Sequence, residues 1–364
     1  MGRGSARGAF AGPALLLASL AFALAAAEGI VRVLAPAAAS RIEYPCFYEP
    51  DEALGFHYLP YGRGTVSGHF EIDHTVELNS LGFYDDEPLP GSPGLRVLAV
   101  GDSFTAALNV ARDEVWTSVL ERELRARGYP DADVVNIGLD GTGTDVHLEL
   151  LRRYVPRFLP QVVVLAFFAN DPEDVEVGRF TRECYRGYVL SYQTAEQQGR
   201  LRARVDAESG RRGLRWLFAR SLLARLALVA WEGPRTLLRL NFVQPSRAEL
   251  GLTPDVLASR ADRPRQSFEA LARFASQCEC ALLVAPVPAR RELGASLELA
   301  RSVARGLPLE IVDVLPGIRA RLAAAGKSPA DLFFVHDAHL NAWGNRVFAE
   351  ALADAVSWPP PRGR

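Results

Sequence analysis

Short apolar runs alternate with amphipathic helical patterns from residue 95 to the C-terminal region. The apolar runs are 95–100, 134–137, 162–168, 281–285 and 309–314, and the helical patterns are 115–127, 145–158, 293–305 and 342–356. Such runs separated by helices predict parallel strands with both faces covered. We therefore expect an α/β fold, a three-layer α/β/α sandwich of flavodoxin-like type with about five parallel strands, with ligands beyond the strands' carboxyl ends.

The N-terminus carries an uncharged, largely apolar run of 20 residues, 8–27, preceded by Arg3 and Arg7 and followed by Glu28. Its length suits a membrane span, and a basic flank stays on the cytoplasmic side. The small residues Ala25 and Ala27 also fit a cleavable signal peptide, and a buried soluble helix is the third interpretation. Because the apolar pattern continues to residue 34, we predict a cytoplasmic N-terminus at 1–8, a membrane anchor or signal segment at 9–35, and a remainder of the chain that lies outside the cytoplasm.

Residues 36–94 form a segment rich in Pro, Gly, Tyr and His, with short alternating stretches at 65–72 and 75–78. Alternation of this kind predicts strands, and the Pro-Gly cluster at 88–94 marks a boundary. We expect a small β-rich lead-in at 36–94 and a main domain at 95–358.

A basic insertion interrupts the main domain at about residues 190–262. Within 200–240 it carries ten Arg against three acidic residues, interleaved with Leu, Trp, Phe and Val. This pattern predicts helices. Its basic face either lies on anionic headgroups or caps the acyl site, or it is a solvated face of a helical subdomain, which is the commoner arrangement.

Composition excludes several classes of protein. The formal net charge is −2, with no basic excess over the chain, so a nucleic-acid partner is not predicted. The four cysteines, Cys46, Cys184, Cys278 and Cys280, contain no C-x-x-C pair, which argues against structural zinc. In an oxidising compartment one or two disulfides are possible, with the pairing open, and buried free thiols are the alternative. We predict no metal and no organic cofactor.

The first strand of the main domain runs directly into Gly101-Asp102-Ser103-Phe104-Thr105. A junction from strand to turn to helix presents a serine hydroxyl at the carboxyl edge of the sheet, near the positive end of a helix. Ser103 is therefore a candidate nucleophile. The alternative is a serine that only caps the following helix.

The next two strands end in groups that can bind an oxyanion. The second is followed by Asn136-Ile137-Gly138-Leu139-Asp140-Gly141-Thr142-Gly143, and the third by Asn170-Asp171. Acyl transfer needs donors aimed at a developing oxyanion, and the backbone N–H of Gly141 and the Asn170 amide can supply them. A plain turn and an Asx turn or cap are the structural alternatives.

A base and a carboxylate occur together near the C-terminus, in His336-Asp337-Ala338-His339. A serine hydroxyl needs a general base, and the imidazole needs an anionic partner to orient it. His336 and His339 compete for this role. Surface histidines ahead of a helix capped by Asn341 are the alternative.

Taken in order, these four blocks resemble the SGNH/GDSL hydrolase family over roughly residues 95–357. The resemblance implies that Ser103 is the nucleophile, that the N–H groups of Ser103 and Gly141 and the Asn170 amide form the oxyanion hole, and that His339 is the base beside Asp337. One departure is the Asp-x-His spacing, where many members have Asp-x-x-His. The N-terminal span and the segment 79–83 also resemble membrane-anchored bacterial members.

The predicted function is a serine esterase acting on a small-molecule or glycan ester at a membrane, for example an O-acetyl group of an envelope glycan or a lipid ester. Two alternatives remain open. One is an O-acyltransferase that modifies an exported polysaccharide beside a membrane acyl-donor protein. The other is a noncatalytic glycan-binding protein that uses the same cleft.

Overall fold

The computed structural model describes residues 11–34, 44–68, 71–91, 94–209, 221–224, 227 and 241–360. Its centre is a five-stranded parallel sheet of order β12-β11-β7-β5-β6. The strands are β5 (Leu95–Gly101), β6 (Ala132–Asn136), β7 (Val162–Phe167), β11 (Ala281–Pro286) and β12 (Glu310–Ile311). The prediction of five parallel strands is confirmed, although β12 is shorter than the apolar run that predicted it.

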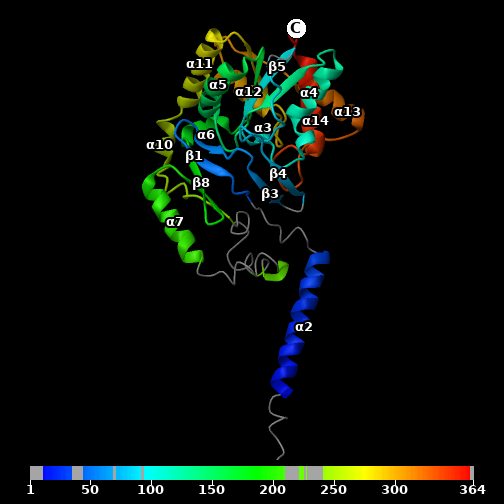
Figure 1. The fold of residues 1–364 in the computed structure, drawn as a ribbon, viewed down its shortest axis with the longest axis vertical. Helices are drawn as coiled ribbons and strands as arrows, with labels where there is room; N and C mark the ends of the chain where they lie inside the picture. Colours follow the sequence, from blue (N-terminus) through cyan, green and yellow to red (C-terminus); the bar gives the residue numbers. More distant parts are fainter. Residues whose placement is uncertain are drawn as a thin grey trace, which may run out of the picture.

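Helices cover both faces of this sheet, so the three-layer sandwich is also confirmed (Figure 1). Along β5, Leu98 and Val100 belong to a core shared with α5 and α11, whereas Val97 and Ala99 belong to a second core shared with α4 and α14. This alternation follows from the two-residue period of a strand. The bounds of the helices are α4 (Trp116–Ala126), α5 (Thr144–Phe158), α11 (Arg263–Gln277), α12 (Ala295–Val303), α13 (Leu315–Ala325) and α14 (Ala342–Ala355).

The lead-in consists of two antiparallel pairs, β1 (Tyr48–Asp51) with β2 (Gly55–Tyr58) and β3 (Arg63–Gly68) with β4 (Ile72–Glu77). The stretch predicted as one strand, 65–72, contains the end of β3 and the first residue of β4. Buried aromatic residues of the lead-in belong to the same core as α5, and the Phe83 and Tyr154 rings meet edge to face at 5.3 Å. The hydrophobic core therefore continues across the Pro-Gly cluster that ends the lead-in.

The region of the predicted insertion contains helices and also strands that were not predicted. A three-stranded sheet of order β10-β9-β8 is formed by β8 (Thr181–Tyr185), β9 (Tyr188–Tyr192) and β10 (Phe242–Val243). The described helices nearby are α6 (Asp171–Val177), α7 (Ala195–Ser209) and α10 (Pro254–Ala258). Most of the basic stretch predicted at 200–240 lies outside the described residues.

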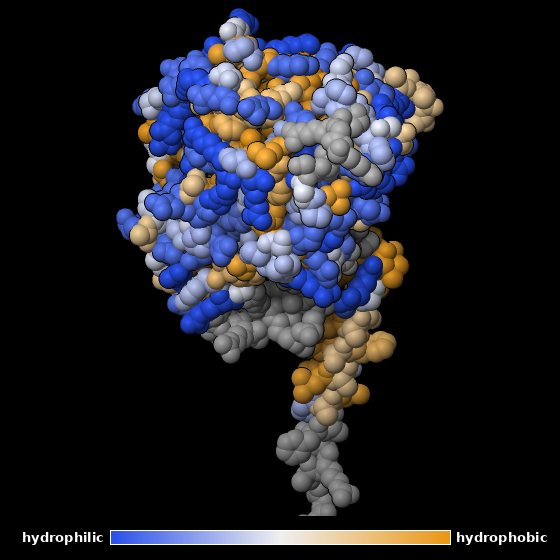
Figure 2. All heavy atoms as spheres, turned by 45° about the horizontal axis from the view of Figure 1, so that its top comes forward, coloured by the Kyte–Doolittle hydropathy of each residue, from blue (hydrophilic) through white to orange (hydrophobic). Residues whose placement is uncertain are grey.

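Helix α2 (Ala11–Leu34) projects from the body of the molecule (Figure 1). Among the described residues it is the one helix that is long and apolar enough to cross a membrane, over residues 12–34. No part of its apolar stretch is buried in the structure. Figure 2 shows it as a hydrophobic rod beside a mainly hydrophilic body. Toward its C-terminal end, Glu28 accepts hydrogen bonds from the backbone N–H groups of Leu222 and Leu223.

Two disulfides join the four cysteines. Cys46 of the lead-in pairs with Cys184 of β8, with 5.4 Å between their Cα atoms, and Cys278 pairs with Cys280. The first bridge links segments that are 138 residues apart in the sequence. It therefore fixes the lead-in against the small sheet.

Candidate active site

Ser103 lies where β5 gives way to the four-residue helix α3 (Ser103–Ala106). The residue that caps this helix is Asp102, whose buried carboxylate accepts the N–H of Phe104. The alternative of Ser103 as the N-cap is therefore wrong, and its hydroxyl is free for other contacts. A side chain at Gly101 would collide with Thr105 and the carbonyl of Ala166, so the turn requires glycine there.

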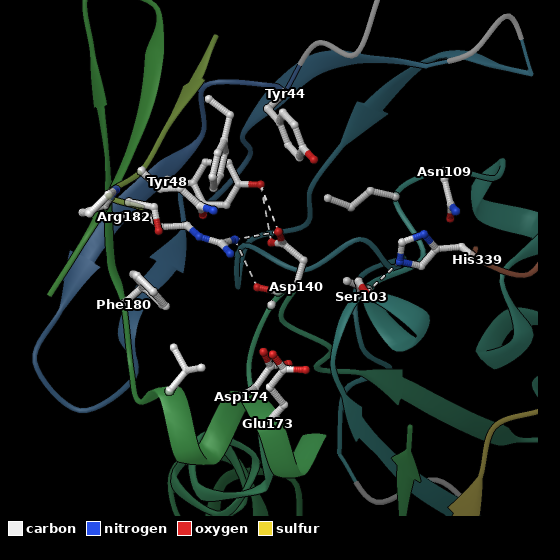
Figure 3. A pocket seen from close by; sticks show the side chains of 18 of the residues that line it. Tyr44, Tyr48, Ser103, Asn109, Asp140, Glu173, Asp174, Phe180, Arg182 and His339 are labelled. Atoms are coloured by element: carbon white, nitrogen blue, oxygen red, sulfur yellow. Dashed lines mark hydrogen bonds and ion pairs between the residues drawn. The ribbon is translucent and has the colours of Figure 1, made fainter. Parts of the chain in front are cut away.

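His339 connects Ser103 to Asp337. Its Nε2 atom lies 2.8 Å from the Ser103 Oγ atom, and its Nδ1 atom lies 2.5 Å from Asp337 Oδ1 (Figure 3). The backbone N–H of His339 donates to the same Asp337 oxygen at 2.7 Å. The His336 ring is half exposed and faces Glu71 instead. Of the two histidines, the structure brings His339 to Ser103.

The pKa of His339 is raised above its ordinary value. Burial by itself lowers this pKa, but the hydrogen bond and charge of Asp337 and the charges of Asp102 and Asp140 more than offset it. The Phe104 ring also lies against the imidazole, at 4.8 Å between centroids. The arrangement holds an imidazole ready to accept a proton from Ser103.

Two of the three residues predicted to supply oxyanion donors lie at one cleft. Ser103 and Gly141 both line it, and neither backbone N–H has an acceptor among the described residues. Gly141 has a φ of 64°, in the left-handed region. Asn170 is at the N-cap position of α6, where its amide nitrogen donates to Asp174 at 2.9 Å and its side chain makes no capping bond. The Asp102 carboxylate is a further side-chain hydrogen-bond partner of Asn170, and Asn170 is not among the residues that line the cleft.

Below these donors lies a group of buried carboxylates that the sequence analysis did not single out. Asp102 and Asp171 are fully buried, and Asp174 lines the cleft. Burial, together with the negative charge of Asp102, raises the pKa of Asp174 to about 7, and burial raises that of Asp102 to about 6. No group of three or more His, Cys, Asp or Glu side chains in the described part of the chain is arranged to hold a metal ion.

The cleft itself has a volume of about 660 Å³. The lead-in contributes Tyr44, Val66 and Ile72 to its wall, and the chain around β10 contributes Phe242, Leu250 and Leu252. The cleft is therefore bounded by segments outside the central sheet. It is larger than an acetyl group alone requires.

The fold and the site together define an α/β/α protein whose Gly-Asp-Ser serine lies at the carboxyl edge of a parallel sheet. The sequence model of the GDSL-like Lipase/Acylhydrolase family matches residues 99–347, and the chain belongs to this family.

Solved structures similar to this chain include TesA, with 15% sequence identity over 71% of this chain and 97% of that chain and a TM-score of 0.38. A lipase/acylhydrolase from Enterococcus faecalis is 15% identical over 71% and 94% of the two chains, with a TM-score of 0.37. A catalytic mutant of Axe2, an acetylxylan esterase from Geobacillus stearothermophilus, is 14% identical over 76% and 100%, with a TM-score of 0.37. No curated protein matches the sequence.

Proposed function

We propose that the protein is a serine esterase that works through an acyl-enzyme on Ser103. The observation that carries the proposal is the unbroken line of contacts from Ser103 Oγ through His339 to Asp337, with distances of 2.8 and 2.5 Å. A serine is a weak nucleophile unless a positioned base accepts its proton. Family membership supports ester bonds as the target.

In the proposed first step, His339 Nε2 takes the proton of Ser103 while Oγ forms a bond to the ester carbonyl carbon. The negative charge that develops on the carbonyl oxygen is held by the N–H groups of Ser103 and Gly141 and by the Asn170 amide. The bond to the leaving alcohol then breaks, and His339 gives its proton to that oxygen. Water repeats the sequence and releases the acid.

We further propose that α2 anchors the domain outside the cytoplasm, within reach of the membrane surface. Arg3 and Arg7 precede the span, and basic flanks stay cytoplasmic. Two disulfides fit an oxidising compartment. The span ends at Leu34 and Tyr44 lines the cleft, so a fully extended chain of ten residues allows at most about 36 Å between them. An envelope glycan ester or a lipid ester is within reach of such a cleft.

Labelling with a fluorophosphonate tests the nucleophile directly. We expect the detergent-solubilised full chain to be labelled and Ser103→Ala not to be. The matched control is Ser191→Ala, because Ser191 is a buried serine that lines the same cleft and should label like the wild type. Equal labelling of folded Ser103→Ala and wild type would place the reactive nucleophile at another residue, whereas no labelling of the folded wild type would favour a glycan-binding role.

A second assay identifies the acyl acceptor. Hydrolysis of an aryl acetate is measured with and without an added oligosaccharide, and acylated oligosaccharide is quantified by mass spectrometry. We expect free acid as the main product. A dominant yield of acylated sugar would assign the protein as an O-acyltransferase instead.

A further inference from the structure

Residues outside the central sheet hold the loop between β6 and α5. They contact Asp140, the residue before Gly141. The Asp140 carboxylate accepts hydrogen bonds from the hydroxyl of Tyr48, in the lead-in, and from Arg182 of β8 (Figure 3). It also accepts the hydroxyl of Tyr58, again in the lead-in. The Asp140 backbone N–H donates to the Tyr58 hydroxyl at 3.0 Å. Neither tyrosine is more than 2% exposed.

Arg182 makes a second contact that bears directly on the oxyanion hole. Its Nη1 atom donates to the backbone carbonyl of Asp140 at 3.1 Å as well as to the carboxylate at 2.6 Å. The carbonyl of Asp140 and the N–H of Gly141 belong to one peptide group, and in a trans peptide they point in opposite directions. Fixing the carbonyl toward Arg182 therefore fixes the N–H on the opposite side.

The Arg182 side chain is itself firmly placed. It is only 8% exposed, and its guanidinium lies 4.3 Å from the centroid of the Phe56 ring and 5.4 Å from that of Phe242. Cys184, two residues after Arg182 in β8, forms the disulfide with Cys46 of the lead-in. A planar guanidinium between aromatic rings, with an ion pair along its edge, has little freedom to rotate.

Gly141 is shaped to accept this arrangement. A Cβ atom at position 141 would collide with Nη2 of Arg182, and the φ of 64° already disfavours any side chain there. The glycine therefore allows the guanidinium to lie directly against the peptide that carries the oxyanion donor. Arg182 is paired with Asp140, so it brings no unbalanced charge to the cleft.

We propose that Arg182 is a positioning residue for catalysis, which aims the Gly141 N–H at the developing oxyanion by holding the Asp140 carbonyl, with Tyr58 bracing the same residue from the lead-in. The inference rests on the proposed esterase function. It makes the lead-in part of the catalytic unit rather than a spacer between membrane and enzyme.

The test is Arg182→Lys in the full chain, which keeps the charge but removes the planar guanidinium whose Nη1 atom reaches both Asp140 acceptors and whose face packs against the Phe56 ring. Because the donor contributes mainly in the transition state, we expect kcat on an aryl ester to fall about 10- to 100-fold with KM changed less than about threefold. The rate of fluorophosphonate labelling should fall in parallel.

Arg96→Lys is the matched control. Arg96 is 4% exposed, pairs with Asp133 and donates to the carbonyl of Gly91, but it lies at the start of β5, at the opposite end from Ser103. We expect Arg96→Lys to destabilise the fold while keeping kcat per active site within about twofold. The substitution lies far from Ser103, so molecules that remain folded keep an intact active site. Equal losses of kcat in the two variants would overturn the proposal.

Tyr58→Phe provides a second variant if Arg182→Lys does not fold. It removes both hydrogen bonds to Asp140 and keeps the ring, and we expect kcat to fall about 5- to 20-fold. A folded variant of either kind with wild-type kcat, in a protein where Ser103→Ala is inactive, would overturn the positioning role alone. Activity that survives Ser103→Ala would instead overturn the esterase mechanism.

Discussion

Asp337 contacts His339 twice through a single oxygen, Oδ1, which accepts both the backbone N–H and the ring Nδ1–H of the same residue. This double contact explains how the Asp-x-His spacing, which is shorter than Asp-x-x-His, still orients an imidazole. Asp337 begins a tight turn, and His339 is the second residue after it. The spacing is thus compatible with the proposed triad.

The first prediction concerns Asp337→Asn. The base must be neutral to accept a proton, and the pKa of His339 is raised, so wild-type kcat/KM should rise with pH through a value above 6.5 and then level off. The variant should lose about 100-fold or more in kcat, and its rising limb should move to lower pH, because a major contribution that raises the pKa is gone. Rates between pH 5 and 9 measure both; an unmoved limb would contradict the assignment.

The second prediction distinguishes the two neighbouring histidines. His339→Gln should reduce kcat by about 1000-fold or more, since His339 is the only base that contacts Ser103 among the residues that the structure describes. His336→Gln should remain within about twofold of the wild type, because its ring is half exposed and faces Glu71. Steady-state assays of both variants decide the matter, and a reversed order would place the base at residue 336.

The third prediction is that Asp174→Asn stabilises the fold at neutral and alkaline pH. The pKa of Asp174 is about 7 in the folded protein and about 3.8 in the unfolded chain. The folded state therefore loses stability as pH rises from about 4 to 7, because the unfolded chain gives up the proton first. The variant should therefore match the wild type near pH 4 and exceed it by about 4 kcal/mol at pH 8. Urea unfolding across this range measures the difference.

The control for that series is Glu173→Gln. Glu173 is the adjacent residue, its side chain is 60% exposed, and it pairs with Arg247 at the surface. Its free energy of unfolding should change by less than about 0.5 kcal/mol at any pH in the range. A similar gain in both variants would show that the effect is general charge relief rather than burial of Asp174.

The fourth prediction compares the two disulfides. Replacing Cys46 and Cys184 by Ser frees a loop with a sequence separation of 138, for which chain entropy predicts a loss of about 3–5 kcal/mol. Replacing Cys278 and Cys280 frees a separation of 2 and should cost much less. Guanidinium unfolding of both double variants tests the difference; equal losses would mean that loop length is not the cause.

Much of the central fold could be predicted from sequence because its strands lie in short apolar runs, and the first three of them are followed by candidate site residues. Ser103, Gly141 and Asn170 each follow one of three successive strands. Parallel strands deliver their carboxyl ends to one edge, so the sequence alone predicted that Ser103 and Gly141 would share a cleft.

The positioning contacts could not be predicted in this way. Tyr58 and Asp140 are 82 residues apart, and Asp140 and Arg182 are 42 apart, so no local pattern connects them. The strand β8 was missed because Thr181–Tyr185 mixes charged with aromatic residues and contains no apolar run. The residues alone left His336 and His339 open, the family resemblance favoured His339, and the structure places His339 against Ser103.

The bridge between Cys46 and Cys184 closes a covalent ring in the polypeptide. Ser103, Gly141 and Asn170 lie on this ring, whereas Asp337 and His339 lie on the tail that leaves it. A single cut by a protease within the ring, for example at the exposed turn of Arg127 and Gly128, opens the ring without dividing the molecule. Both pieces then migrate as one chain on a gel until the bridge is reduced, and a nicked enzyme keeps its nucleophile attached to the segment that bears its base.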